Sequence, residues 1–286
     1  MDKLKLKYIS FVIVFLKITL ISIILIKYLP EATEKELLFD ETFFWFLLAG
    51  FLAQIVDGAL GMAYGVTSNT VLLGFGLSPK LASAAVHTAE VFTTGVSGLS
   101  HIMFGNFDKL LFLKLIIPGV ITASLGAFLL GSVIDGEVIK PYITTYLLIL
   151  GIIILIKAFK KKVDTKRNLK NASLYAAFGG FLDAIGGGGW GPIVTSNLIR
   201  QGNTPSIIIG TVNTAEFFVT FFSAGILIYF TGIQSWQIIL GLIIGGVIAA
   251  PLGAFVTKKV PQKAMTISVG SLIILTSLFS LYKVLL

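Results

Sequence analysis

A run of four glycines followed by Trp-Gly-Pro interrupts an apolar stretch of this chain, which reads GGFLDAIGGGGWGP from Gly179 to Pro192. Glycine weakens a helix interior, and Pro192 has no backbone N–H to donate to one. We therefore expect the backbone to break between Ile185 and Trp190. Within a membrane, broken backbone is tolerated only where protein or a water-filled cavity satisfies its polar groups, so this run limits the chain to folds that provide such a place.

Composition places the chain in a membrane. Of its 286 residues, 56% are hydrophobic and only 13% are charged, which leaves too little polar surface for a soluble globular protein. The formal net charge of +8 resides mainly in loops between apolar spans, so it reports orientation in the bilayer and argues against a nucleic-acid partner. The chain has no cysteine, which excludes disulfides, iron–sulfur clusters and thiolate chemistry.

A weaker version of the same break occurs in the first half, where Gly50-Phe51-Leu52 is followed by DGALGMAYG from Asp57 to Gly65. Later landmarks also correspond between the halves: Thr67-Ser68-Asn69 with Thr195-Ser196-Asn197, His87-Thr88-Ala89-Glu90 with Asn213-Thr214-Ala215-Glu216, and Leu125-Gly126-Ala127-Phe128 with Leu252-Gly253-Ala254-Phe255. Their separations differ by only a few residues, which indicates an internal duplication. Paired interrupted segments in two halves point to the binding site of a transporter.

We expect an all-α polytopic membrane protein with a leading helix and two repeats. The leading span runs from Tyr8 to Leu29; it is too long for a signal-peptide core, and no small-x-small cleavage site follows it. Lys17 near its middle is expected to face protein or to snorkel. The other candidate spans, each near the ~20 residues that a bilayer requires, are Pro79–Phe104, Phe107–Val133, Pro141–Phe159, Ser206–Phe230, Trp236–Val256 and Ala264–Leu285.

Charges in the loops decide the topology. If both broken segments crossed the membrane, the basic loop from Lys157 to Lys170 would lie outside, against the positive-inside rule. If each segment is instead a re-entrant helical hairpin, that loop falls inside with Arg200 and Lys258-Lys259-Lys263, and the acidic stretches Glu31–Glu41 and Asp135–Glu137 fall outside. The hairpins leave seven spans, with the N-terminus cytoplasmic and the C-terminus external. Each repeat then holds a hairpin and three spans, and because three is odd the repeats must be inverted.

These expectations divide the chain into four parts. Residues 1–42 hold the cytoplasmic N-terminus, the first transmembrane helix and the acidic external connector, and residues 43–160 form repeat 1. Residues 161–172 form the basic cytoplasmic loop, and residues 173–286 form repeat 2. The protein is expected in the cell membrane, with the lipid bilayer as its surroundings. Glycine-rich faces such as Gly241, Gly245, Gly246 and Gly253 could pack helices within one chain or between two, so a homodimer is left open.

Four acidic residues fall within membrane-embedded segments, where an ionisable side chain is costly without a partner or a cavity: Asp57, Glu90, Asp183 and Glu216. The two aspartates lie beside the breaks and could instead cap broken-helix amides. The helix from Pro79 carries a polar stripe that includes His87 and Glu90, and its serines and threonines fit contacts between helices. Histidine titrates near neutral pH, and a partly buried glutamate can be shifted toward it. We therefore expect five side chains to handle protons: His87, Glu90, Glu216, Asp57 and Asp183.

His87 and Glu90, three apart on one helix face, could also be a metal pair. A metal enzyme would need more histidine ligands, and His101 is the only other histidine. We therefore expect neither a metal nor a cofactor.

The breaks favour a small anion as cargo. Half-helices beginning near Met62 and Trp190 would present free backbone N–H groups and the positive end of a helix dipole. No lysine or arginine lies in the middle of a span after Thr42, so backbone dipoles and neutral side chains would hold the anion. The expected substrate-binding residues are Gly58, Gly61, Tyr64, Thr67, Ser68, Asn69, Gly186, Gly187, Gly188, Gly189, Trp190, Thr195, Ser196, Asn197 and Asn213. Glycines that only permit close helix packing would give the same composition.

The two glycine-broken segments at the head of a duplicated apolar chain, with GFLDAIGGGGWGP and TAE in the second half, resemble the TauE/SafE family of sulfite and organosulfonate exporters. The resemblance covers roughly Phe43 to the end. It implies a secondary transporter of the cell membrane that exports sulfite, sulfoacetate or other sulfur-containing anions, driven by the proton gradient. The first repeat departs from the dense glycine run of the family, with Asp57-Gly58-Ala59-Leu60-Gly61-Met62 in its place, so the two sites need not be equivalent.

Two other classes of protein use some of the same features. An ion channel can also contain broken helices, and its flux would not saturate or need a counter-transported proton. A membrane-embedded enzyme lacks support, because the chain has no G-x-S-x-G nucleophile elbow and no cysteine. A serine hydrolase built on Ser68 or Ser196 would be labelled by a fluorophosphonate probe. A transporter of a different small anion also remains an alternative.

Overall fold

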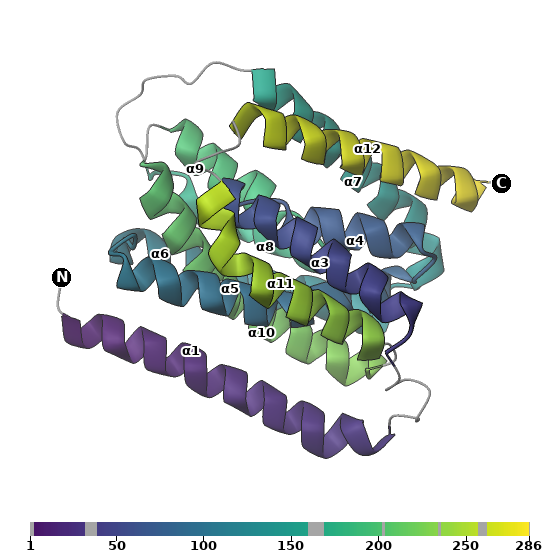
Figure 1. The fold of residues 1–286 in the computed structure, drawn as a ribbon, viewed down its shortest axis with the longest axis horizontal. Coiled ribbons are helices and arrows are strands. Elements are labelled where there is room, and N and C mark those ends of the chain that lie inside the picture. The colour runs from purple at the N-terminus through teal and green to yellow at the C-terminus, as the bar shows by residue number, and fades with distance from the viewer. Residues whose placement is uncertain are drawn as a thin grey trace.

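The computed structural model describes residues 3–31, 39–159, 169–201, 204–233, 236–256 and 262–285. Every regular element in these ranges is helical, which confirms the expected all-α class. The helices lie side by side in one bundle, and the two ends of the chain lie at opposite ends of that bundle (Figure 1). The central part of the acidic connector, the basic loop from 160 to 168 and the Lys258-Lys259 pair lie outside the described residues.

The order of helices occurs twice, as the internal duplication predicts. After α1 (Lys3–Ile23), the π-helical turn η1 (Ile24–Tyr28) and η2 (Leu29–Glu31), the first series is α3 (Glu41–Leu60), α4 (Tyr64–Gly74), α5 (Pro79–Met103), α6 (Lys109–Phe128) with η3 (Leu129–Val133), and α7 (Gly136–Phe159). The second series is α8 (Ala172–Gly186), η4 (Gly191–Thr195) leading into α9 (Ser196–Arg200), α10 (Pro205–Thr231), α11 (Trp236–Val256) and α12 (Gln262–Leu285). Each series thus holds a long helix, a short one and three long ones.

Six helices in the described ranges are long and apolar enough, by length and composition, to cross a membrane: Lys7–Tyr28, Glu41–Gly58, Lys109–Val133, Gly136–Phe159, Pro205–Thr231 and Thr266–Lys283. They make the chain a multi-pass membrane protein, and one of them, Glu41–Gly58, lies in the segment expected as a re-entrant hairpin and not as a span. Two expected spans are helices but are not among the six: α5 has the required length and carries the polar stripe, and the apolar part of α11 is shorter. The last span of the first series begins at Gly136 and not at the expected Pro141, so Pro141 lies inside the helix, where it has no N–H to donate to the preceding turn.

Both expected breaks are present. Helix α8 ends at Gly186, and the next residue, Gly187, has a left-handed φ of 63°, so the predicted break between Ile185 and Trp190 is confirmed. Helix α3 ends at Leu60 and is followed by Gly61 with φ 64°, and Ala63 has φ 98° just before α4 begins. A left-handed glycine after the last helical residue is a common helix terminator because it has no Cβ to clash. The glycines at the two breaks therefore end the first helix of each series.

The two series interlock. Helix α3 packs mainly on α11, α8 on α6, α5 on α10, and α7 on α12, so each principal contact joins one series to the other. Helix α1 lies along one side of the bundle (Figure 1) and contacts α5. As expected, Lys17 faces protein: its Nζ donates to the Phe92 carbonyl oxygen at 3.4 Å and lies 5.5 Å from the centre of the Phe92 ring.

Candidate functional site

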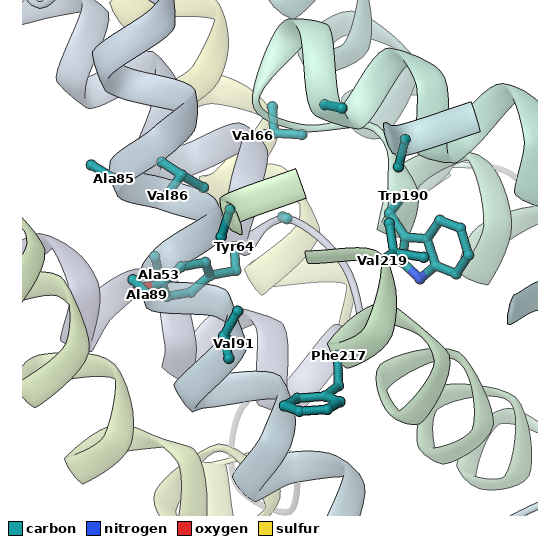
Figure 2. Packing of buried hydrophobic residues seen from close by; sticks show 14 of the residues in the cluster. Ala53, Tyr64, Val66, Ala85, Val86, Ala89, Val91, Trp190, Phe217 and Val219 are labelled. Carbon is teal, nitrogen blue, oxygen red and sulfur yellow. The ribbon is translucent and has the colours of Figure 1, made fainter. Parts of the chain in front are cut away.

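The two breaks meet at the centre of the bundle, backbone against backbone. A Cβ on Gly188 would lie 2.5 Å from the Val66 nitrogen, and one on Gly191 would lie 2.6 Å from the Met62 Cα. Figure 2 shows Tyr64 and Val66 of α4 in the same buried cluster as Trp190. A side chain at Gly188 or Gly191 would force this backbone apart, because real Cβ atoms do not approach so closely. The glycine run therefore serves a close approach as well as a helix break.

A small pocket lies where the breaks meet. Its lining residues come from both series: Ala63, Tyr64, Gly65, Val66, Glu90, Asp183, Gly188, Gly189, Gly191, Pro192 and Glu216. Its free volume is only ≈ 10 Å³, which is room for about one water molecule. The pocket is therefore nearly closed in this conformation.

Asp183 joins the second break to the polar stripe of α5. One carboxylate oxygen, Oδ1, accepts a hydrogen bond from the backbone N–H of Trp190 at 3.1 Å. The other, Oδ2, lies 3.3 Å from His87 Nε2, and both side chains are buried. Asp183 thus caps the second half-helix, as one interpretation of the sequence held, and also contacts the histidine.

The surroundings of His87 fix its tautomer. Its Nδ1 lies 2.8 Å from the Ser83 carbonyl oxygen, which can only accept, so Nδ1 carries a proton. The other ring nitrogen, Nε2, faces Asp183, and this contact is attractive only if a further proton lies between the two groups. Ser83 is itself held in place, because its hydroxyl donates to the Ala184 carbonyl oxygen at 2.8 Å. The His87–Asp183 contact therefore joins α5 to the second break.

Glu90 and Glu216 occupy matching places in the two series, and both are pocket-lining residues. Each is buried, and its backbone carbonyl accepts from a threonine hydroxyl one turn later, Thr94 at 2.5 Å and Thr220 at 2.9 Å. Glu90 Oε1 lies beside Gly65, where an added Cβ would be 2.9 Å from it. Its other oxygen, Oε2, has no hydrogen-bond partner among the described residues. A buried carboxylate with a free oxygen is unusual away from functional sites.

Asp57 corresponds to Asp183 at the first break. It is buried, and its carboxylate interacts with the backbone N–H of Tyr64, the residue that begins α4. Both aspartates therefore face the start of the half-helix that follows them.

His87, Glu90 and Asp183 could hold a metal ion by distance alone. One ligand atom from each lies within 4.8 Å of the others, and all three side chains are buried. One imidazole and two carboxylates suit divalent ions such as Mn²⁺, Fe²⁺ or Zn²⁺. The sequence suggested only the pair on α5, because the third group comes from the other series and is distant along the chain.

The structure brings some predicted substrate-binding residues to the pocket and leaves others behind it. Tyr64, Gly188 and Gly189 line the pocket, whereas Gly58, Gly61, Gly186 and Gly187 do not. The Trp190 side chain points away from it: the ring packs against Gly119 and Val219, and its Nε1 donates to the Val212 carbonyl oxygen at 3.4 Å. Trp190 contributes its backbone N–H to the site instead.

The two Thr-Ser-Asn triplets lie on the half-helices behind the pocket. Asn69 donates to the Gly186 carbonyl oxygen at 2.5 Å and so ties α4 to the second break, whereas Asn197 donates to Ile193 of its own helix at 2.7 Å. Thr67 and Thr195 have buried hydroxyls without a hydrogen-bond partner among the described residues. Ser68 is buried, and Ser196 is half-buried. Asn213, which corresponds to His87, donates to the Ser97 hydroxyl at 2.8 Å.

Sequence reasoning missed two residues of α7 that contact the second break. Tyr146 donates its hydroxyl to the Gly188 carbonyl oxygen at 2.9 Å. Lys157 donates to the Pro192 carbonyl oxygen at 3.0 Å and to the Ser196 hydroxyl at 2.6 Å. Segment η4 is π-helical, and such turns are frequent at functional sites. Lys157 looked like the first residue of the basic loop, and no pattern along the chain marks Tyr146.

Paired broken helices that meet around a buried, polar pocket in a multi-pass membrane protein define the transporter class. Comparison with known proteins agrees. Residues 46–280 match the model of the family described as "Sulfite exporter TauE/SafE", and the chain belongs to that family. A probable membrane transporter protein, YtnM of Bacillus subtilis (strain 168), is 44% identical over 241 residues, which are 81% of this chain and 80% of that protein. No solved structure matches the chain. The protein is therefore a membrane transporter of the TauE/SafE type and not an enzyme, as expected.

Proposed function

We propose that this protein is a secondary transporter that carries small sulfur-containing anions, such as sulfite, sulfoacetate or other organosulfonates, and couples their movement to protons. The observation that carries the proposal is the pocket between the two breaks, with its buried carboxylates and a histidine beside them. Alternating access around this pocket would expose it to one side of the membrane at a time. The description of the family as sulfite exporters suggests the class of anion and export as its physiological direction.

Support for an anion comes from the half-helices. Gly65 and Gly191, at the beginning of α4 and η4, line the pocket, and helix starts present unsatisfied N–H groups. Tyr64, Gly188 and Gly189 would complete the contact surface. The other substrate-binding candidates would act by shaping the half-helices behind the pocket.

Support for protons comes from the five buried ionisable groups, His87, Glu90, Glu216, Asp57 and Asp183. Intramembrane carboxylates and histidines that face a cavity are typical of proton relays. The contact between His87 and Asp183 joins two of these groups across the two series. A divalent ion on His87, Glu90 and Asp183 is the competing interpretation, and the test below separates the two.

The orientation is also part of the proposal. We infer a cell-membrane protein with a cytoplasmic N-terminus and an external C-terminus, consistent with chain ends at opposite ends of the bundle (Figure 1). The repeats would be inverted, with one hairpin entering from each side. Cysteines introduced at either end of the chain and labelled from outside in intact cells would test this orientation.

The test is uptake into proteoliposomes that contain the purified full-length chain. Radiolabelled sulfite, sulfoacetate and taurine are supplied separately, with and without an imposed pH gradient and with and without a chelator. We expect saturable uptake of at least one anion, stimulated by the gradient and indifferent to the chelator. Flux that does not saturate would indicate a channel, chelator-sensitive flux would indicate the metal, and no flux of any sulfur anion would remove the proposed substrates.

Variants sharpen the assignment of the proton groups. Glu90→Gln and Glu216→Gln should each lose most of the stimulation by pH. The control is Glu137→Gln, because Glu137 is exposed and pairs with Lys140 at 3.6 Å, away from the pocket-lining residues. If both glutamate variants kept full pH-driven transport, the proton-coupling assignment would be wrong.

A further inference from the structure

We propose that the anion and protons are carried together and in the same direction, because the pocket accepts an anion only when Glu90 and Glu216 are protonated. This inference rests on the proposed function and concerns the sign of the coupling. An exchanger that moves protons one way and the anion the other would need the opposite relation between the two ligands.

The wall of the pocket is acidic. Three carboxylates line it, Glu90, Asp183 and Glu216, and no lysine or arginine is among the described residues that do. Asp57 on α3 also acts electrostatically on both glutamates. An anion in this pocket therefore meets several carboxylates at close range in a medium that screens them poorly.

Nearby cations do not offset this charge. His87 contacts Asp183 at 3.3 Å, so a positive charge on its ring would be offset by that carboxylate and would not compensate the glutamates. Lys17 of α1 is held at the Phe92 carbonyl, and Lys157 of α7 at Pro192 and Ser196; neither side chain lines the pocket. The remaining titratable neighbours, Tyr64 on α4 and Tyr146 on α7, are neutral phenols near physiological pH. The glutamates themselves must lose their charge before an anion enters.

The donors that an anion would use are the backbone N–H groups at the starts of the two half-helices. The Trp190 N–H at the second half-helix is already taken by Asp183. At the first half-helix, Glu90 Oε1 lies beside Gly65 in the first turn of α4, where an anion would bind. An ionised Glu90 therefore occupies the position of the anion, and a protonated Glu90 no longer competes as a charge. Ionised glutamate and bound anion exclude each other.

Reciprocity then sets the direction of the coupling. If protonation promotes anion binding, anion binding promotes protonation by the same factor. The loaded carrier holds both ligands, and it crosses between its two states with both. An inward proton gradient therefore drives anion uptake, and net export needs an outward anion gradient that exceeds the proton gradient.

The experiment uses proteoliposomes with a pH-sensitive dye inside and the membrane voltage clamped by potassium and valinomycin. Sulfoacetate is added outside at equal internal and external pH, since its sulfonate and carboxylate stay ionised near neutral pH. We expect the lumen to acidify as labelled sulfoacetate enters. A lumen that becomes more alkaline would show exchange, and uptake without a pH change would show uncoupled transport; either result overturns the inference. Absence of any uptake would instead overturn the proposed function on which it rests.

A binding measurement on the detergent-purified protein gives a second, independent result. Where both glutamates ionise, the dissociation constant for sulfoacetate should rise about a hundredfold per pH unit, because two protons are taken up with the anion. Glu90→Gln and Glu216→Gln should each reduce this to about tenfold and still bind sulfoacetate at high pH. Glu137→Gln should keep the wild-type dependence. A dissociation constant independent of pH in the wild-type protein would overturn the inference even if a buried variant failed to fold.

Discussion

The two breaks differ in what faces the aspartate beside each of them. Asp183 at the second break contacts His87 from the other series, at 3.3 Å. The residue that corresponds to His87 in the second series is Asn213, which cannot be charged and donates to Ser97 instead. Asp57 at the first break therefore lacks the equivalent of the histidine partner. The duplication kept the position of the aspartate and changed the residue at the position of its histidine partner.

The backbones of the two breaks also differ, and the second break again has the more specialised contacts. The second break uses Gly188 and Gly191 to meet the backbone of the first, whereas Gly61 at the first break meets the flexible side chain of Ile209. The second half-helix begins with the π-helical η4 and is held by Lys157, while α4 is α-helical throughout. The specialised contacts therefore gather at the second break, and residues of both series supply them. Three pairs of substitutions test how far this asymmetry extends.

The largest effect is expected from Gly188→Ala, because the new Cβ would lie 2.5 Å from the Val66 nitrogen, and backbone cannot move aside as a side chain can. We expect a loss of about 3 kcal/mol or more in stability, and loss of transport with it. The matched control is Gly225→Ala on α10, where a Cβ would meet nothing within 4 Å. Thermal unfolding of the two purified variants in detergent measures the difference. Equal midpoints would show that the breaks do not pack as described.

The next largest effect is expected from Asp183→Ala, whose loss of stability is compared with that of Asp57→Ala. Removing Asp183 leaves His87 without its partner and uncaps Trp190, which should cost about 3 kcal/mol or more, as for other broken buried pairs. Removing Asp57 loses only a cap, worth about 1 kcal/mol. Unfolding midpoints of both variants, measured side by side, should therefore fall further for Asp183→Ala. Equal losses would mean that the two aspartates have equivalent roles.

The smallest effect is expected from substituting the lysines in the last turns of α7 and α12, whose losses of stability are compared. Half-buried Lys157 holds Pro192 and Ser196, so Lys157→Met should cost about 2 kcal/mol, as for other hydrogen bonds to charged groups. Exposed Lys283 makes a 3.3 Å contact to the Gly74 carbonyl, so Lys283→Met should change stability by no more than about 0.5 kcal/mol. Denaturant titration can resolve such a gap. A larger loss from Lys283→Met would reverse the asymmetry.

Much of this protein follows from its sequence by local rules. Glycine and proline act on the backbone where they stand, so the GGGGWGP run predicted the break after α8, and apolar length predicted a multi-pass helical protein. The duplication predicted the repeated order of helices, and the cost of intramembrane charge selected Asp57, Glu90, Asp183 and Glu216. Each of these inferences needs only a residue, its neighbours and the solvent around them.

Only the tertiary structure decided which of these groups meet. His87 and Asp183 belong to different series, and their contact depends on how α5 packs against α8. The same packing formed the His87–Glu90–Asp183 cluster, turned the Trp190 ring away from the pocket, and brought Tyr146 and Lys157 to the second break. Contacts between distant segments depend on helix register and crossing angle, which the pattern of one helix does not contain. The sequence therefore determined the parts of the site, and the packing of the two series determined their partners.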